Sequence, residues 1–165
     1  MQIYTDGAKL PIGESRGEPV GLTLGLPAAL LQWTTAHEVE ALREAFARGN
    51  LPPEFHGKLR ALAGGDLSDR FIEQNCRLFS ELLLASEDGS FRESSRSERE
   101  RLLRVLAYVR KEQDAIPDYL PGGLKDDQQE VRAAAVELGG LLRSFKAWRL
   151  RHQVPGMWLS HALSV

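Results

Sequence analysis

Apolar residues recur every three or four positions along most of residues 34–153, which is the spacing of helices that bury one face. This spacing predicts five helical segments. Each segment is bounded by residues that start or stop a helix, such as capping side chains, prolines and glycines. The predicted starts are Thr35, Pro52-Pro53, Asp66 or Ser68, the serines at 94, 95 and 97, and the turn that holds Asp126 and Asp127. The segments are predicted to end near Gly49, Gly64-Gly65, Ser86, the connection that contains Pro117 and Pro121, and Pro155.

The third and fifth segments differ from the others in the width and length of their apolar faces. Ile72, Cys76 and Leu83 lie on one line of the third segment, with further apolar residues beside it, so we expect this helix at the centre of the fold. The fifth segment is predicted to be the longest helix. The pair Gly139-Gly140 interrupts its middle, which indicates either a bend or the close approach of another element.

The overall pattern predicts a mainly α-helical bundle of about five helices, because no strand pattern of comparable length occurs. The helical domain is expected to cover residues 34–153. Residues 1–33 have prolines and charges in no periodic order, so an irregular arm is predicted, in which residues 2–5 and 21–26 could form a short hairpin. Residues 154–165 are predicted to form a C-terminal tail.

Composition narrows the class of protein. Of the 165 residues, 42% are hydrophobic and 27% are charged, as in globular proteins, and the net charge of −2 gives no overall attraction to nucleic acid. The N-terminal residues lack the basic and apolar regions of a secretory signal. The most apolar run, Val20–Leu31, is shorter than the roughly 20 residues of a membrane span. A soluble, cytoplasmic protein without a membrane span is therefore expected.

Residues that could carry out covalent or metal chemistry are few and scattered. The serine at position 15 matches a G-x-S-x-G pattern, but the prolines at 11 and 19 indicate a polar loop, whereas a nucleophilic serine needs a strand-to-helix turn. No two of the histidines at 37, 56, 152 and 161 have the spacing of metal ligands. Cys76 is the sole cysteine and is expected to be a buried thiol. We therefore predict a protein that is not an enzyme.

The connection between the fourth and fifth segments is the most unusual stretch of the chain. Pro117 and Pro121 force Ile116 and Leu120 out of the helical conformation, and Gly122-Gly123 allows the chain to reverse. The same stretch holds four aspartates, which are Asp114, Asp118, Asp126 and Asp127.

These aspartates have two alternative roles. In the structural alternative, Asp126 and Asp127 accept backbone N–H groups at the start of the last helix, Asp114 and Asp118 stabilise turns, and Lys125 or the arginines of the fourth segment neutralise the charge. In the functional alternative, the four carboxylates converge on a Mg²⁺, Mn²⁺ or Ca²⁺ ion, since these cations prefer oxygen ligands. The sequence favours the structural alternative and otherwise predicts no cofactor.

A family resemblance rests on the same connection. Tyr108, then Asp114-Ala-Ile-Pro-Asp118, then Pro121-Gly-Gly-Leu-Lys-Asp-Asp127 resembles the signature of the YkvA-like bacterial domain of unknown function. The resemblance covers about residues 102–138, with a turn that is one residue shorter than in that family. It implies two helices joined by a shaped acidic corner, and it implies no activity. The flanking helices of this chain carry basic residues where the family commonly has apolar ones.

Basic residues are concentrated in two segments. Arg92–Lys111 holds seven basic residues and three glutamates, and Leu141–His152 holds four basic residues and no acid. A nucleic-acid interface is one interpretation. A solvated helix surface explains the same pattern, and no aromatic residues alternate with the basic ones for base stacking, so nucleic acid is not the expected partner.

Taken together, the patterns predict a small helical interaction or adaptor module that binds another protein. A metal site with hydrolytic activity and nucleic-acid binding are the alternatives. Whether the chain forms an oligomer stays open.

Overall fold

The computed structural model describes residues 34–112, 118 and 121–152. The predicted arm with its hairpin, the predicted tail, and the connection residues Asp114, Ile116, Pro117 and Leu120 lie outside the described residues.

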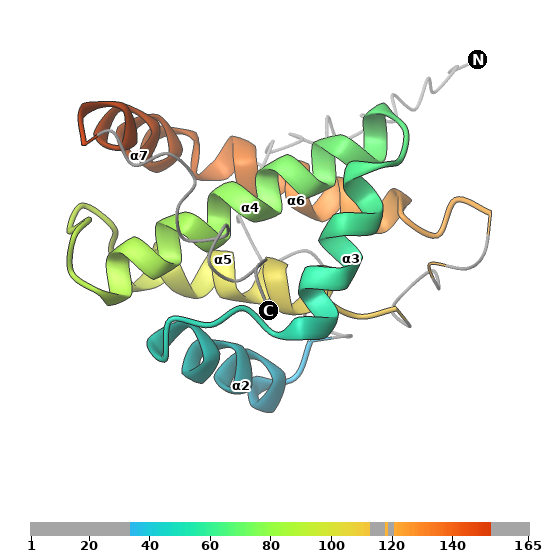
Figure 1. The fold of residues 1–165 in the computed structure, drawn as a ribbon, viewed down its shortest axis with the longest axis horizontal. Helices are drawn as coiled ribbons and strands as arrows, with labels where there is room; N and C mark the ends of the chain where they lie inside the picture. The colour runs from blue at the N-terminus through green and yellow to red at the C-terminus, as the bar shows by residue number, and fades with distance from the viewer. Residues whose placement is uncertain (1–33, 113–117, 119–120, 153–165) are drawn as a thin grey trace, which may run out of the picture.

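The described residues form a bundle of six α-helices (Figure 1), so the predicted fold class is confirmed and the helix count is one higher than expected. No strand occurs among these residues. The helices are α2 (Ala36–Ala47), α3 (Pro53–Ala63), α4 (Leu67–Glu87), α5 (Arg96–Val109), α6 (Lys125–Glu137) and α7 (Gly139–Arg151).

Three of the helices begin at capping boxes. The side chains of Thr35, Asp66 and Ser95 each accept a hydrogen bond from the backbone N–H three residues later, and the acid at that third position bonds back to the cap. These local signals are why the predicted starts agree with the observed ones. After α2, Gly49 has a φ of 73°, the left-handed conformation that glycine adopts without steric cost.

The extra helix arises because the predicted fifth segment is two helices. Leu138, with φ −97° and ψ 18°, ends α6 and precedes α7. A Cβ added to Gly140 would meet no atom within 4 Å, and one added to Gly139 would meet only the Arg143 side chain at 3.5 Å. The glycine pair therefore marks a bend and not a close contact. The prediction of one long helix here is wrong, and α4, with 21 residues, is the longest helix described.

The predicted central position of the third segment is confirmed. α4 packs against α2, α3, α5 and α6, and its Ile72, Cys76 and Phe79 are fully buried. α7 packs against α6 at one end of the bundle (Figure 1). It is held there by an aromatic cluster in which Phe91, from the α4–α5 loop, lies 5.1 Å from Phe145 and 5.7 Å from Trp148 between ring centroids.

The surroundings of Gly140 and the backbone conformation of Gly49 predict opposite effects on stability when each glycine is replaced by alanine. Gly140→Ala should raise the free energy of unfolding by about 0.4–1 kcal/mol, because the site has room and alanine restricts the unfolded chain. Gly49→Ala should lower it by about 1–2 kcal/mol, because its backbone is left-handed. Urea denaturation followed by circular dichroism measures both, and a destabilised Gly140→Ala would show that the glycine is needed for packing.

Candidate functional site

A buried lysine, Lys58 of α3, stands at the centre of the acidic connection. Its side chain is only 10% exposed. Its Nζ lies 2.7 Å from Asp118 Oδ2 and 3.3 Å from Asp127 Oδ2, and it donates to the backbone carbonyl of Lys111 at 2.7 Å. One ammonium group thus joins α3, the chain just after α5, the connection and α6.

The helical faces explain how these groups come together. Asp127 lies one turn before Val131 on α6, so its carboxylate points to the core with the apolar residues and is fully buried. Lys58 stands three residues after Phe55 and four before Leu62, both buried, so its stem also faces the core. The sequence analysis missed Lys58. The signal that could have found it is a lysine placed between core positions of a helix.

Tyr108 fixes the third described aspartate. This tyrosine is fully buried at the end of α5, and its hydroxyl donates to Asp126 Oδ2 at 2.6 Å. A short hydrogen bond from a buried phenol to a carboxylate ties the end of α5 to the first turn of α6. The two helices that flank the connection are therefore joined directly by side chains.

The neighbouring aspartates keep Lys58 charged. Burial alone lowers the pKa of the Lys58 ammonium, but Asp127 and Asp118 outweigh burial, so its pKa lies above the ordinary value and the group stays charged. Burial raises the pKa of Asp118, against the opposing effect of Lys58, and the nearby Asp126 carboxylate raises it further. Lys58 is thus the main counter-ion of this corner.

The structure corrects part of the structural alternative. Neither Lys125 nor the arginines of α5 neutralise Asp118 and Asp127, since Lys58 does so. Leu124, the N-cap of α6, provides no side-chain cap, while Asp126 accepts from Tyr108 and Asp127 accepts from Lys58. Both aspartates still lie in the first turn of α6, where the helix dipole favours a negative charge.

Three of the four predicted metal ligands therefore gather at one corner, while Asp114 lies outside the described residues. Asp118 and Asp127 direct their Oδ2 atoms at Lys58, and Asp126 directs its Oδ2 atom at Tyr108. Among the residues that the structure describes, no group of three acids, histidines or cysteines is arranged to hold a metal ion.

The predicted reversal after the connection lies at residues 121–124. Gly122 has a φ of 78° and its carbonyl accepts the Lys125 N–H at 3.0 Å, while Pro121 is exposed and Gly123 is buried. The turn forms one wall of a depression of about 320 Å³, which we call the notch. The notch is lined by Asp66, Ser68, Asp69, Asp118, the turn residues 122–124, Lys125 and Gln128.

Two further reactive side chains, Cys76 and His56, are buried. Burial raises the pKa of the Cys76 thiol and the neighbouring Asp127 raises it further, so the thiol stays protonated. Burial lowers the pKa of His56, and Arg60 and Arg77 lower it further, so its ring is neutral at pH 7. The protonated Cys76 thiol is therefore not an activated nucleophile.

The two basic segments have different surroundings. On α5 and just after it, four basic residues form ion pairs with acids of this chain: Arg101 with Glu137 at 2.8 Å, Arg104 with Glu100 at 3.3 Å, Arg110 with Glu54 at 3.9 Å and Lys111 with Glu38 at 2.8 Å. On α7, Arg149 binds Glu81 of α4 at 2.5 Å. Within the described part of the chain, Arg143, Lys146 and Arg151 form no ion pair.

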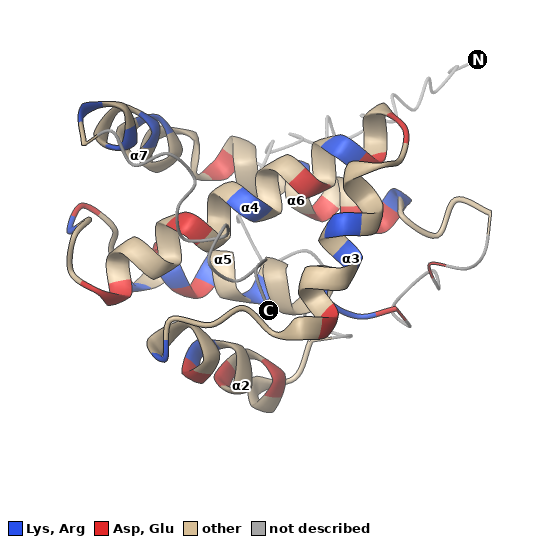
Figure 2. Cartoon of the chain, in the orientation of Figure 1, with Lys and Arg blue, Asp and Glu red and all other residues tan. Residues whose placement is uncertain are grey.

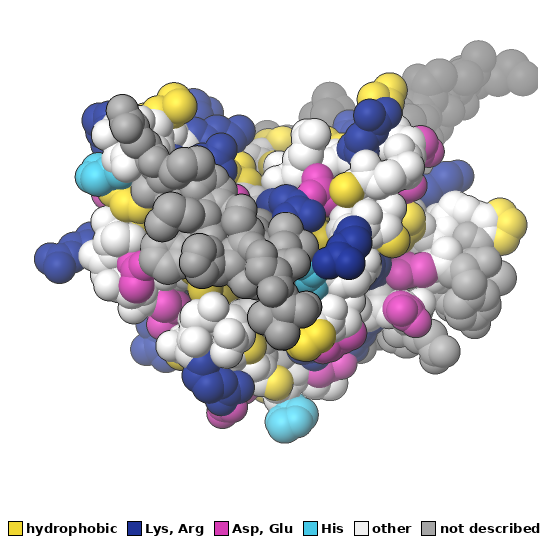
Figure 3. Space-filling view, viewed as in Figure 1, with side chains coloured by type: hydrophobic (Ala, Val, Ile, Leu, Met, Phe, Trp, Pro, Cys, Tyr) yellow, Lys and Arg dark blue, Asp and Glu magenta, His cyan; other side chains and the backbone are white. Residues whose placement is uncertain are grey.

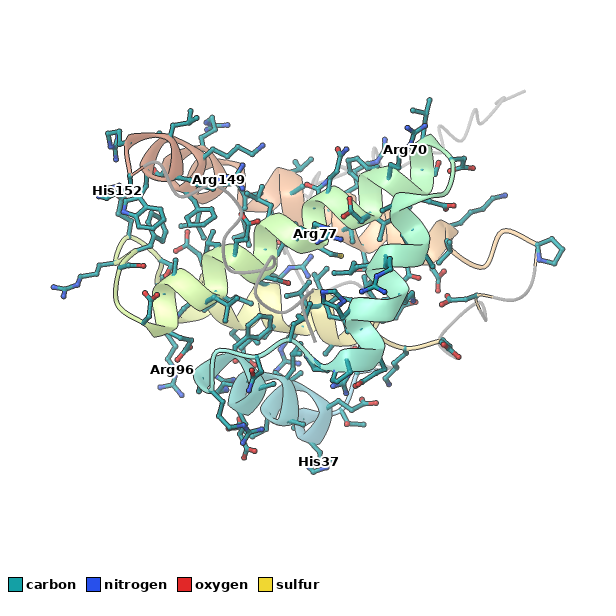
Figure 4. The ribbon with its side chains drawn as sticks, in the orientation of Figure 1. His37, Arg70, Arg77, Arg96, Arg149 and His152 are labelled. Carbon is teal, nitrogen blue, oxygen red and sulfur yellow. The ribbon has the colours of Figure 1, made fainter. Side chains whose placement is uncertain are left out.

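These unpaired residues share one side of α7, which we call the outer face and define as Arg143, Lys146, Ala147, Leu150 and Arg151. All five are exposed, and Leu150 is 79% exposed. Figure 2 shows α7 with basic positions and no acidic one, and Figure 3 shows basic side chains gathered over it. Figure 4 shows the Arg149 side chain on α7 beside α4, where it binds Glu81.

Comparisons with protein-family models, curated proteins and solved structures give no match to this chain. The resemblance to the YkvA-like domain therefore stays a prediction. Every helix in the described ranges is too short or too polar to cross a membrane.

The acidic corner predicts that Lys58→Met destabilises the fold by about 3–5 kcal/mol, because Asp127 would keep a buried charge without a counter-ion. Lys125→Met, the same change at an exposed position of the corner, should alter the free energy of unfolding by no more than about 0.5 kcal/mol. Urea denaturation measures both.

Adding Asp118→Asn and Asp127→Asn to Lys58→Met should recover much of the loss, because no buried charge would then remain unpaired. If Lys58→Met were as mild as Lys125→Met, the bridge would contribute little to stability.

Proposed function

We propose that this protein is a non-enzymatic helical interaction module that binds another protein through the outer face of α7. The observation that carries the proposal is the combination of an exposed leucine with basic side chains that no acid of the described chain neutralises. Leu150 lies one turn after Lys146 and two turns after Arg143 on the same side of the helix.

Helix stability does not account for this face. Basic residues complement the helix dipole in the last turn, which explains Arg149 and Arg151. Arg143 and Lys146 lie further from the C-terminus, where that effect has faded, and neighbouring like charges repel by a few tenths of a kcal/mol. A leucine exposed among them adds no stability either. Binding of a partner explains why Arg143, Lys146 and Leu150 are exposed together.

The composition of the face favours a protein over nucleic acid. An exposed aliphatic side chain within a polar rim is typical of a protein contact. Binding of single-stranded nucleic acid normally adds exposed aromatic rings, and the aromatic residues of α7, Phe145 and Trp148, are buried against Phe91. Two of the four arginines of α5, Arg101 and Arg104, form ion pairs with acids of this chain, which further weakens a two-helix nucleic-acid interface.

In this proposal the buried bonds of the acidic corner support the module, and α7 provides the surface that binds the partner. Lys58 and Tyr108 hold the carboxylates inward and join α3, α5 and α6. A rigid frame of this kind presents α7 in one orientation, which lowers the ordering cost when a partner binds.

A cytoplasmic location accompanies the proposal. The sole cysteine is buried in the core, so the fold uses no disulfide of the kind common in oxidising compartments. Fractionation of host cells tests the location, and recovery of the protein outside the cytoplasmic fraction would contradict it.

The proposal predicts that Arg143→Glu/Leu150→Asp reduces partner capture about tenfold or more, since it reverses one charge and removes the apolar contact. Chemical crosslinking and affinity capture from host lysate, with quantitative mass spectrometry, measure the loss. Arg96→Glu serves as the matched control, because Arg96 is also exposed and forms no ion pair in the described chain, and it should leave capture unchanged. Capture that nuclease abolishes would favour the nucleic-acid alternative, and a turnover activity would refute the proposal.

A divalent-cation site is the second candidate function. It is favoured by the convergence of Asp118 and Asp127 on one cationic centre, at 2.7 and 3.3 Å from Lys58 Nζ. Carboxylate oxygens are the ligands that Mg²⁺, Mn²⁺ and Ca²⁺ prefer. Such a cation would have to displace the Lys58 ammonium or bind beside it.

Calorimetric titration of the wild type with each ion tests this candidate, with Asp118→Asn as the control. Binding heat that disappears in Asp118→Asn would support the site. The absence of heat with all three ions would remove it.

A further inference from the structure

The chain carries a surface that complements the outer face of α7 at the opposite end of α4. This surface is the notch together with Leu67, the first residue of α4, which is 80% exposed. Asp66 and Asp69 line the notch, and Lys125 is the one basic residue among its described lining residues. One end of the bundle thus presents Leu67 beside Asp66 and Asp69, with the exposed Arg70 one turn after it. The other end presents Leu150 beside basic residues and no acid.

We infer that the outer face of α7 of one copy docks into the notch of a second copy. The inference rests on the proposed function, because it uses the same face of α7 and names its partner. A second copy is the occupant favoured here because both halves of the complementary pair lie on this chain.

The charges of the two surfaces fit each other. Asp66 Oδ1 accepts the Asp69 N–H at 3.0 Å, and Asp69 Oδ2 accepts the Asp66 N–H at 3.3 Å. Each carboxylate uses one oxygen in this capping box and keeps the other for a partner. The guanidinium of Arg143 or Arg151 in the second copy supplies the N–H donors that a carboxylate accepts best.

Apolar contacts add to the charge pairing. Leu150 and Leu67 are 79% and 80% exposed in the single chain, so both gain from burial in an assembly. Leu124 lines the notch and is half-buried, which gives an incoming leucine an apolar surface to contact. A depression of about 320 Å³ has room for such a side chain.

The geometry prevents one copy from satisfying both surfaces itself. α4 carries Leu67 at its first residue and Glu81, which binds Arg149 of α7, fourteen residues later. That separation is about 21 Å along the helix. Figure 4 shows Arg70, near the start of α4, well apart from Arg149 and His152. The contact is therefore head-to-tail, and repeated copies form a ring or an open chain.

An anionic membrane fits the same face less well. A helix that binds a membrane surface needs its whole apolar side free to enter the lipid. The apolar side of α7, with Leu142, Phe145 and Trp148, is buried in the bundle, which leaves Leu150 as the single large apolar residue outside.

Two variants, each disabled on one surface, test the inference. The first, Arg143→Glu/Lys146→Glu, reverses the outer face of α7. The second, Asp66→Asn/Leu67→Lys, reverses the notch, and its asparagine keeps the helix cap. Sedimentation velocity over a range of concentrations should show wild-type self-association that weakens with salt, while each variant alone associates about tenfold or more weakly.

An equal mixture of the two variants gives the decisive measurement. The intact α7 of the second variant should dock into the intact notch of the first, so the mixture should associate more tightly than either variant alone. Arg96→Glu is the control and should associate like the wild type. Circular dichroism of each variant establishes that it is folded.

A wild type that stays monomeric at every concentration would overturn the inference. So would self-association that persists in both variants, or mixed variants that associate no more tightly than either variant alone. In each of these cases, loss of partner capture by Arg143→Glu/Leu150→Asp would still support the proposed function, so the two failures can be told apart.

Discussion

A buried cation joins α3 to the connection and to α6. Lys58 reaches from α3 into the space between the end of α5 and the start of α6, where it binds two carboxylates and a backbone carbonyl. An ammonium group removed from water costs several kcal/mol unless its donors are satisfied, and here three acceptors surround it. This bridge therefore fixes α3 and the connection relative to each other.

The Lys58 bridge also bears on the two alternative roles of the aspartates in the connection. In the sequence, aspartates near a helix start and among prolines and glycines are compatible with two roles. They can cap the helix, or they can bind a metal ion. The described carboxylates are used by Lys58 and by the buried hydroxyl of Tyr108. These carboxylates are therefore bonded inside the fold, whereas Arg143, Lys146 and Arg151 on α7 form no ion pair within the described residues.

α7 is held on one side and exposed on the other. Aromatic contacts with Phe91 and the ion pair with Glu81 hold one side of the helix, and its outer face keeps its basic residues and Leu150 exposed. The bend at Leu138 makes this arrangement possible, because a straight continuation of α6 would carry the same residues in another direction. A break between two short helices thus presents a surface that one long helix would not.

Local signals were sufficient to predict where most helices begin, because caps such as Thr35, Asp66 and Ser95 act on backbone groups within one turn. Apolar spacing likewise predicted the central place of α4, since burial of a wide apolar face needs neighbours on several sides. The counter-ion of Asp118 and Asp127 could not be predicted in this way. Lys58 lies sixty residues before Asp118 in the chain, and the choice among Lys58, Lys125 and the arginines of α5 depends on which side chain the packing removes from water. The split of α6 from α7 was ambiguous for a related reason, since a glycine pair permits both a bend and a close contact, and only the positions of neighbouring atoms distinguish them.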